Sequence, residues 1–218
     1  MSDHDLSADR ARALALTPVS RETGARLDRF VALLLKWQEI THLIAPSTVP
    51  HLWTRHIADS LQLLELAPAA KIWVDMGTGG GFPGLVIASA LYGMAGRRVH
   101  LVESNAKRAA FLREAVAATG SPAVVHAVRM EKFVETFADR PDIVTARAVS
   151  PLSLLLGQCL PLLRAGTVGL FPKGQDVEAE LTDASKYWNM AADLAPSRTD
   201  SKARIVIIRA LAPRRPLP

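Results

Sequence analysis

The stretch VDMGTGGGFPG, Val74 to Gly84, overlaps the end of a short β-prone run. Gly77, Gly79 and Gly81 let the chain turn tightly and bring its backbone close to a ligand with no side chain in the way. Pro83 suits the first turn of the helix that follows, where its missing N–H costs nothing. In open α/β sheets, such a loop lies at the carboxyl ends of the strands, where ligands bind. We therefore predict a ligand-binding strand–loop–helix unit here.

From residue 69 onward, short β-prone runs alternate with helical segments. The β-prone runs are Lys71–Met76, Arg98–Glu103, Ala123–Val128, Asp142–Arg147, Thr167–Lys173 and Ala203–Ala210. Between them, helical patterns cover Gly84–Tyr92, Ala106–Thr119, Leu152–Leu163 and Val177–Tyr187. Such alternation argues for a mostly parallel sheet with helices on both faces. A weaker strand, Trp188–Leu194, precedes the last run without a helix between them, so these two are expected to form an antiparallel hairpin at one edge. The predicted fold class is α/β, a Rossmann-like, doubly wound sheet with an antiparallel edge strand.

The residues before this alternation have helical character. Apolar residues follow helical spacing from Arg21 to Leu35 and from about Leu52 to Leu66. Pro46 and Pro50 bracket the turn between the two patterns. We predict an N-terminal tail and helical cap at residues 1–68, a ligand-binding domain at 69–211 and a disordered basic tail at 212–218.

The composition is that of a globular protein with an ordinary core. Hydrophobic residues make up 49% of the chain and charged residues 22%. No apolar run is long enough to span a bilayer, and the polar start MSDHDLSADR lacks the pattern of a secretory signal. The single cysteine, Cys159, lies in an apolar helical pattern and is expected to be buried in a reducing compartment. We therefore expect a cytoplasmic protein with no membrane segment.

The net charge of +5 is concentrated at the carboxyl end of the chain. Residues 197–218 contain six basic residues and one acid. Such a segment can meet a polyanion, because lysine and arginine neutralise phosphates and release counterions. It can equally be a solvated strand face followed by a frayed end, and composition alone favours this second interpretation.

The glycine loop has two functional interpretations. Gly79, Gly81 and Gly84 match the G-x-G-x-x-G fingerprint of dinucleotide-binding proteins, so an NAD-dependent oxidoreductase is one alternative. Asp75 argues against it, because a carboxylate there repels a pyrophosphate and suits the sulfonium and ammonium groups of S-adenosylmethionine. Glu103 closes the second strand, where a carboxylate accepts hydrogen bonds from both ribose hydroxyls in either class of protein. The loop thus favours S-adenosylmethionine as the cofactor.

Five motifs occur in an order and spacing that resemble one protein family. They are RHIADS (Arg55–Ser60), VDMGTGGGFPG, VRMEKF (Val128–Phe133), DIVTARAVSPL (Asp142–Leu152) and FPKG (Phe171–Gly174). Over about residues 25–210, the chain resembles the bacterial small-subunit ribosomal RNA guanine-N7 methyltransferases, also called the glucose-inhibited division protein B family. The family's Trp-x4-Asn-Leu-Thr segment is only partly kept. Trp37 is present, but His42 and Ile44 stand where Asn and Thr are usual.

This resemblance implies a class I methyltransferase that uses S-adenosylmethionine, needs no metal and acts on ribosomal RNA, in the small subunit or an assembly intermediate. It also implies that Gly77 and Phe82 line the cofactor, that Met130 and Glu131 border its adenine, and that Arg147 lies across the site. The complete predicted cofactor set is Asp75, Gly77, Gly79, Gly81, Phe82, Glu103, Met130, Glu131 and Arg147. Simpler alternatives are that Met130 fills the core and that Glu131 complements the start of a helix.

The chemistry implied by the family needs no general base. Guanine N7 carries a lone pair and no proton, so it attacks the sulfonium methyl directly. The segment 146–149 reads Ala-Arg-Ala-Val where amino-directed methyltransferases carry Asn/Asp-Pro-Pro-aromatic, and we assign no proton-transfer residue. A structural role is the better interpretation of His56. The predicted substrate contacts are basic residues near strand ends and in the basic segment: Arg147, Lys173, Arg198 and Arg204.

Three alternatives to this function stay open at this point. A methyltransferase with another RNA, a small molecule or a protein as substrate shares the fold and the cofactor. The NAD-dependent oxidoreductase rests on the glycine fingerprint alone. An RNA-binding protein that senses the cofactor without catalysis has the same binding residues.

Overall fold

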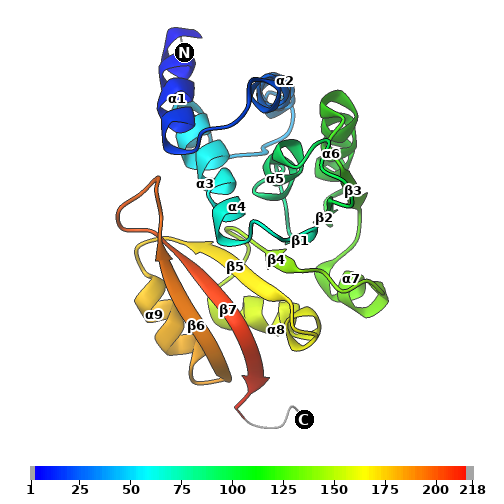
Figure 1. Ribbon diagram of the computed structural model, residues 1–218, viewed down its shortest axis with the longest axis vertical. Helices are drawn as coiled ribbons and strands as arrows, with labels where there is room; N and C mark the ends of the chain where they lie inside the picture. Colours follow the sequence, from blue (N-terminus) through cyan, green and yellow to red (C-terminus); the bar gives the residue numbers. More distant parts are fainter. Residues whose placement is uncertain (1–2, 215–218) are drawn as a thin grey trace.

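The computed structural model describes residues 3–214, which form a single seven-stranded sheet with helices on both faces (Figure 1). The strands are β1 (Ile72–Met76), β2 (Arg98–Val102), β3 (Ala123–His126), β4 (Ile143–Thr145), β5 (Val168–Lys173), β6 (Trp188–Pro196) and β7 (Arg204–Pro213). Their order is β3-β2-β1-β4-β5-β7-β6, with β1 to β5 parallel and β7 antiparallel to both of its neighbours. The predicted mostly parallel sheet with an antiparallel hairpin at its edge is confirmed.

The last strand of the chain lies inside the sheet, and β6 forms the edge. Every residue from Ile205 to Ile208 of β7 is buried, whereas most residues of β6 are exposed or half-buried. A strand covered on both faces needs apolar side chains on both faces, which only β7 of this pair offers. The hairpin therefore inserts β7 beside β5 and leaves the more polar β6 at the solvent.

The helices form two layers, one on each face of the sheet. The helical elements are α1 (Asp3–Leu16), α2 (Arg21–Gln38), η1 (Pro46–His51), η2 (Trp53–Ala58), α3 (Asp59–Leu61), α4 (Leu63–Leu66), α5 (Gly84–Ala90), α6 (Ala106–Thr119), α7 (Met130–Thr136), α8 (Leu152–Arg164) and α9 (Val177–Ala184). One core cluster joins the N-terminal helices to α5, α6 and alternate strand residues such as Trp73 and Leu101. The other joins α7, α8 and α9 to the opposite residues, such as Val74 and Met76. Figure 1 shows α5 and α6 on one side of the sheet and α8 and α9 on the other.

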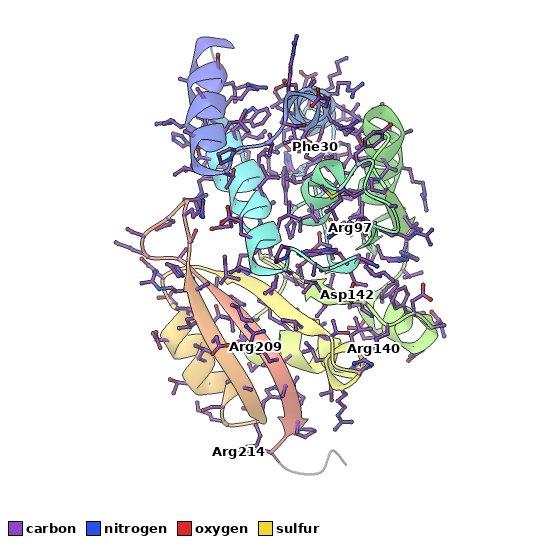
Figure 2. The ribbon with its side chains drawn as sticks, in the orientation of Figure 1. Phe30, Arg97, Arg140, Asp142, Arg209 and Arg214 are labelled. Carbon is purple, nitrogen blue, oxygen red and sulfur yellow. The ribbon has the colours of Figure 1, made fainter. Side chains whose placement is uncertain are left out.

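The N-terminal helices share their core with the sheet. Phe30 of α2, labelled in Figure 2, lies 5.4 Å from the ring of Phe82 and 6.3 Å from that of Phe111. Leu27, Leu34 and Leu52 belong to the same cluster, with further apolar residues of the cap. The division into a cap and a ligand-binding domain at residue 68 stays a prediction, and the core runs across it without interruption.

Helix α1 was not predicted, because its sequence lacks an apolar stripe and its main anchor is polar. Asp9 is fully buried, and its Oδ2 accepts hydrogen bonds from the backbone N–H groups of Trp53 (2.8 Å) and Thr54 (3.2 Å). This carboxylate satisfies backbone donors at the start of η2, as a capping residue does. The predicted helix at 52–66 is divided into η2, which has π-helical geometry, and the short α3 and α4. A π-helical turn widens the helix locally and is often found at functional sites.

The amino end of β1 is held by polar side chains from two other elements. Asp142 Oδ2 accepts hydrogen bonds from the N–H groups of Lys71 (2.7 Å) and Ile72 (2.9 Å), and Arg97 donates to the carbonyls of Pro68 and Ala70. Figure 2 labels Asp142 and Arg97 at this end of the sheet. These contacts fix the strand that leads into the glycine loop.

The C-terminal boundary differs slightly from the predicted one at 211. Strand β7 continues to Pro213, because its backbone pairs with that of β6 (Trp188 with Pro213, Asn189 with Ala212). The N–H of Arg214 donates to the Tyr187 carbonyl over 2.8 Å. The rest of the predicted disordered tail, residues 215–218, lies outside the described residues. Within residues 3–214, no helix has both the length and the apolar character needed to cross a membrane.

Candidate functional site

Asp75, on β1, holds the glycine loop between β1 and α5 through hydrogen bonds to its buried carboxylate. Asp75 Oδ2 accepts a hydrogen bond from Gly84 N–H over 2.7 Å, and its Oδ1 accepts one from the Thr145 hydroxyl over 3.0 Å. The residue is 1% exposed. Its predicted role as a counter-charge for the cationic groups of the cofactor does not fit this position, because both oxygens face the protein. Asp75 shapes the loop instead.

Burial of this carboxylate has an energetic consequence. Burial raises the pKa of Asp75 to about 6, and the hydrogen bonds from the loop and Thr145 together with the Arg147 charge act in the opposite direction. The charged form is therefore less favourable in the folded chain than in the unfolded chain.

The three glycines predicted to bind the cofactor have different surroundings. Gly77 has a φ of +69°, and a Cβ there would lie 2.8 Å from Met130 Cε and 2.8 Å from Val149 Cγ2. Gly79 donates its N–H to Glu103 Oε2 over 3.0 Å. Gly81 faces the core, where a Cβ would lie 3.2 Å from Phe30 Cζ. Of these three glycines only Gly77 borders the hollow described next, and its bare backbone permits the close approach of Met130 from α7 and of Val149 from the loop after β4.

A small hollow of about 170 Å³ lies beside the glycine loop. Four of the predicted cofactor residues line it together: Gly77, Glu103, Met130 and Glu131. The remaining lining residues are Val102 at the end of β2, Ser104 just after it, Val128 and Arg129 before α7, and Gln158 of α8. The structure thus brings together residues that are far apart in the sequence at the carboxyl ends of β1, β2 and β3. We call this site the small hollow.

Glu103 retains the capacity to bind a ribose in the small hollow. Its Oε1 accepts a hydrogen bond from Asn105 N–H (2.7 Å), and its Oε2 accepts the one from Gly79. A carboxylate offers about four acceptor positions, so each oxygen keeps one for a ribose hydroxyl. The two backbone bonds hold the carboxylate in place for that contact. This donor and acceptor pattern fits the nucleoside part of S-adenosylmethionine.

Phe82 and Arg147 lie on the other side of the loop, beneath the cap. Phe82 is 4% exposed, its ring lies 4.9 Å from that of His56, and the Arg147 guanidinium lies 5.4 Å above it. Arg147 Nη1 donates to the Arg55 carbonyl (2.8 Å) and to Asp59 Oδ2 (3.1 Å). Neither residue lines the small hollow, so their predicted cofactor contacts stay predictions. In this structure Arg147 ties the β4 loop to the cap.

His56 takes part, as a neutral side chain, in the same hydrogen-bonded connection between the β4 loop and the cap. Arg147 Nη2 lies 2.5 Å from His56 Nδ1, and His56 Nε2 lies 2.9 Å from the Thr48 hydroxyl. Burial, with the Arg147 charge in second place, lowers the pKa of His56 to about 3. Because a guanidinium only donates, Nδ1 is the acceptor and Nε2 carries the proton. This supports the predicted structural role of His56.

A larger cleft of about 770 Å³ lies between the cap and the β5–β7 side of the sheet. Of the predicted substrate residues, Arg147, Lys173 and Arg204 line it. Lys173 Nζ lies 2.7 Å from Glu180 Oε2 and 3.1 Å from the Ser150 carbonyl, so its charge is paired. Arg204 donates to the carbonyls of Ser201 and Ala203. We call this site the cleft.

Arg198 does not line the cleft. It donates to Glu65 Oε2 (2.5 Å) and to the Leu16 carbonyl (3.1 Å), and so ties the β6–β7 turn to the cap. Sequence reasoning placed it in a basic segment without seeing these acceptors. It missed Arg55, an exposed cleft residue whose side chain has no partner among the described residues. The RHIADS motif was the available signal for Arg55.

The small hollow and the cleft adjoin at Val149. This residue lines the cleft and also packs against Gly77, which borders the small hollow. The preceding Ala148 has a φ of +54°, a left-handed conformation that is costly for a residue with a Cβ. Such local strain often accompanies functional loops. Among residues 3–214 there is no group of three His, Cys, Asp or Glu side chains that could hold a metal ion.

The first prediction concerns the close approach at Gly77. In Gly77→Ala, the new methyl group overlaps Met130 and Val149, so both must move and the small hollow changes shape. We expect affinity for S-adenosylhomocysteine, measured by calorimetry, to fall at least about tenfold, the equivalent of 1.4 kcal/mol.

Gly93→Ala is the matched control for this prediction. Gly93 also has a positive φ (+76°), but nothing lies within 4 Å of a Cβ there. Both variants carry a backbone cost of roughly 1–2 kcal/mol, but only the Gly77 variant is expected to lose affinity. Equal affinities of the two variants would contradict the assigned role of Gly77.

The second prediction concerns the buried Asp75 carboxyl. Its pKa rises from 3.8 to about 6 on folding, so it binds a proton more tightly in the folded chain. Its contribution to stability is therefore fully present below pH 4 and is lost as the pH rises through 6, by up to about 3 kcal/mol. Asp75→Asn lacks this titration, and its amide can both accept from Gly84 and donate to Thr145.

The measurement is urea unfolding of both proteins between pH 4 and 8. The free energy of unfolding of the wild type minus that of the variant is expected to decrease with rising pH, mostly between 4 and 6. A difference that stays constant over this range would show that the carboxyl is not destabilised by burial.

Comparisons of the sequence with known proteins point to one family. The family model described as rRNA small subunit methyltransferase G (GidB) matches residues 24–207. A protein named Ribosomal RNA small subunit methyltransferase G from Bradyrhizobium sp. BTAi1 is 60% identical over 203 residues, which cover 93% of this chain and 91% of the relative. A protein of the same name from Rhodopseudomonas palustris BisB18 is 57% identical over 209 residues, 96% of this chain and 89% of the relative.

Solved structures with low sequence identity share the fold. The O-methyltransferase of Bacillus cereus, in complex with SAH, superposes with a TM-score of 0.61 at 14% identity, over 93% of this chain and 97% of that chain. The O-methyltransferase TomG of Streptomyces achromogenes, in complex with SAM, gives a TM-score of 0.60 at 12% identity, over 96% and 100%. These likenesses confirm the predicted Rossmann-like methyltransferase fold. With the family match over most of its length, the chain belongs to the rRNA small subunit methyltransferase G (GidB) family, as its motifs predicted.

Proposed function

We propose that this protein transfers a methyl group from S-adenosylmethionine to N7 of a guanine in small-subunit ribosomal RNA. The observation that carries the proposal is the junction at Val149 between a small hollow suited to a nucleoside and a cleft large enough for a base. Membership of the methyltransferase G family supports ribosomal RNA as the substrate. Of the alternatives, an NAD-dependent oxidoreductase has no support from the family match.

The cofactor, when bound, supplies an electrophilic methyl group on a sulfonium. In this proposal Glu103 holds the ribose hydroxyls, and Met130 and Glu131 border the adenine; all three residues line the small hollow. The base enters from the cleft, beneath the cap that Arg147 holds in place. Catalysis then comes from the alignment of N7 with the methyl group, since a correctly oriented pair of reactants gains several kcal/mol, up to about 7–11.

Two groups that could take part in proton transfer or nucleophilic attack, His56 at the cleft and the buried Cys159, are unsuited to these roles. His56 is neutral with both ring nitrogens engaged, so it is not free to accept a proton from the substrate. Cys159 is buried in α8, and burial raises the pKa of its thiol to about 12, so it is not a thiolate nucleophile near neutral pH. Attack by an N7 lone pair requires neither group.

The cleft also bears on the choice between RNA and a small molecule. It opens at the surface between the cap and the β6–β7 turn, with Arg55 and Arg204 among its lining residues. An open rim with exposed arginine suits a polyanion, whereas a small-molecule enzyme is expected to close an apolar lid. We further propose that the small subunit or an assembly intermediate is the physiological partner and that the protein acts in the cytoplasm.

The third prediction tests the attacked atom. A substrate RNA with 7-deazaguanine at the target position is expected to accept no methyl group, because carbon replaces N7. With normal RNA, the single-turnover rate is expected to be flat from about pH 7 to 9, since no essential base titrates there and the pKa values of His56, about 3, and of Asp75, about 6, lie below this range. Methylation of the 7-deaza analogue, or a tenfold rise per pH unit, would place the attack at another atom.

The fourth prediction tests the RNA-facing rim. Arg55→Ala removes an exposed charge from the cleft, whereas Arg164→Ala removes an exposed charge at the end of α8, before the amino end of β5 and outside the cleft lining. The slope of log K against log salt for RNA binding is expected to fall by up to about one unit in the Arg55 variant and to stay unchanged in the Arg164 variant. A wild-type slope near zero would favour a small-molecule substrate.

A further inference from the structure

Glu180 of α9 has one fixed and one free carboxylate oxygen at the cleft, which it lines together with Val149 and Lys173. Its Oε2 accepts hydrogen bonds from the Leu152 N–H (2.7 Å) and from Lys173 Nζ (2.7 Å), whereas its Oε1 has no hydrogen-bond partner among residues 3–214. The side chain is 28% exposed, and Oε1 is not one of the buried atoms without a partner, so a ligand in the cleft can reach it. Glu180 thus offers a preorganised acceptor to the occupant of the cleft.

The other acids that line the cleft do not offer such an acceptor. Both oxygens of Asp59 already accept hydrogen bonds from side chains of the protein. Asp176 and Asp200 are exposed, and within residues 3–214 the side chain of Asp176 has no hydrogen-bond partner and that of Asp200 has one, the Lys202 N–H. A side chain that is already fixed loses less conformational freedom when it binds a ligand, so Glu180 is the best prepared of the four.

Chain connectivity places this carboxylate close to the junction of the cleft and the small hollow. Val149 marks the junction, and Leu152, which donates to Glu180, follows three residues later. Three residues span at most about 10 Å, so the carboxylate lies within reach of a base seated at Val149. A guanine whose N7 faces the junction directs its opposite edge into the cleft. That edge carries the 2-amino group, a hydrogen-bond donor that adenine lacks.

We infer that Glu180 is a specificity-determining residue for the target base: its Oε1 accepts a hydrogen bond from the 2-amino group of the guanine. This inference rests on the proposed function, because it takes a guanine in the cleft with N7 at the junction. As N7 gains the methyl group, the base becomes cationic and its amino protons become more acidic. The hydrogen bond to the carboxylate therefore strengthens in the transition state and contributes to kcat.

The experiment measures single-turnover methylation by the full-length protein of small-subunit RNA that carries guanosine or inosine at the target position. Inosine keeps N7 and the 6-oxo group and lacks only the 2-amino group. The wild type is expected to methylate the guanosine RNA at least about tenfold faster at saturation, the equivalent of 1.4 kcal/mol. The two bases also differ in intrinsic reactivity, but this difference is the same for every variant of the protein. A change of preference between variants therefore reports on the protein.

Glu180→Gln tests the acceptor at nearly constant volume. The amide oxygen can still accept from Leu152 and Lys173, and the NH₂ group then replaces Oε1, so that a donor faces the 2-amino group. The maximal rate with the guanosine RNA is expected to fall at least about tenfold, with a smaller loss for the inosine RNA, so the preference shrinks toward one. Glu178→Gln makes the same change at an exposed position of α9 outside the cleft lining and should change neither rate.

Equal losses for the two RNAs in Glu180→Gln would leave Glu180 a structural role only and overturn the inference, as would no loss for either. A rise in KM with kcat unchanged would overturn the contribution to the transition state. If Glu180→Gln folds poorly, the wild type still decides, because equal N7 methylation rates of both RNAs overturn the inference and leave the proposed function standing. If the guanosine RNA gains no methyl group at N7, the proposed function itself fails.

Discussion

The buried carboxylate of Asp75 joins three elements at one point, and the geometry of the candidate site depends on this connection. It belongs to β1, accepts a hydrogen bond from the first residue of α5, Gly84, and accepts another from Thr145 at the end of β4. A Cβ on Gly84 would overlap Leu101 and Asp75 itself, so only glycine permits this approach. With both of its ends fixed, the loop between β1 and α5 has little freedom, and Gly77 is presented to the small hollow.

Arginine side chains set the second constraint, which is the position of the cap relative to the sheet. Arg147 reaches from the β4 loop to Arg55 and Asp59, and Arg198 reaches from the β6–β7 turn to Glu65. Both arginines connect the cap to the sheet side of the molecule. Their donors are largely occupied by the protein, so both have a structural role first; Arg147 lines the cleft and Arg198 does not. The exposed Arg55 is then the better candidate for a phosphate contact.

The sequence predicted the sheet well because the signals for it are local. Each parallel strand is a short apolar run followed by a helix, and Glu103 lies at a strand end, where chain direction alone places it near the glycine loop. The place of β7 inside the sheet is a less local feature. It follows from a comparison of β7 with β6, because of these two strands only β7 has apolar residues on both faces. The anchoring of α1 depends on a single buried carboxylate, Asp9, which looks in the sequence like any other acid.

The orientation of Asp75 shows a different limit of sequence reasoning. Alternate residues of a strand face opposite sides, so Asp75 shares its face with Trp73, beneath α5, and not with a ligand above the strand end. The position of Asp75 does not fit the counter-charge role that the motif predicted, and the cofactor contacts predicted for the loop glycines stay predictions. Lys173 was predicted from its place near a strand end and Arg198 from the basic segment, and the structure pairs Lys173 with Glu180 of α9 and Arg198 with Glu65 of the cap. Such pairings depend on tertiary contacts that a single sequence does not encode locally.

The cleft contains both acidic and basic side chains, and this balance affects how well it accommodates the charge that moves in the proposed reaction. When N7 of guanine takes a methyl group from a sulfonium, the cofactor product becomes neutral and the guanine becomes cationic, so a positive charge moves from the small hollow toward the cleft. A cleft lined only by free arginine and lysine would oppose this movement, because like charges repel strongly where water is partly excluded. In this protein Asp59 accompanies Arg147, and Glu180 accompanies Lys173, over distances of 3.1 Å and 2.7 Å. Pairing keeps the interior of the cleft close to neutral, and the rim carries the exposed Arg55, the proposed phosphate contact, together with the exposed acids Asp176 and Asp200. A cleft of balanced charge fits the cationic product of the proposed reaction.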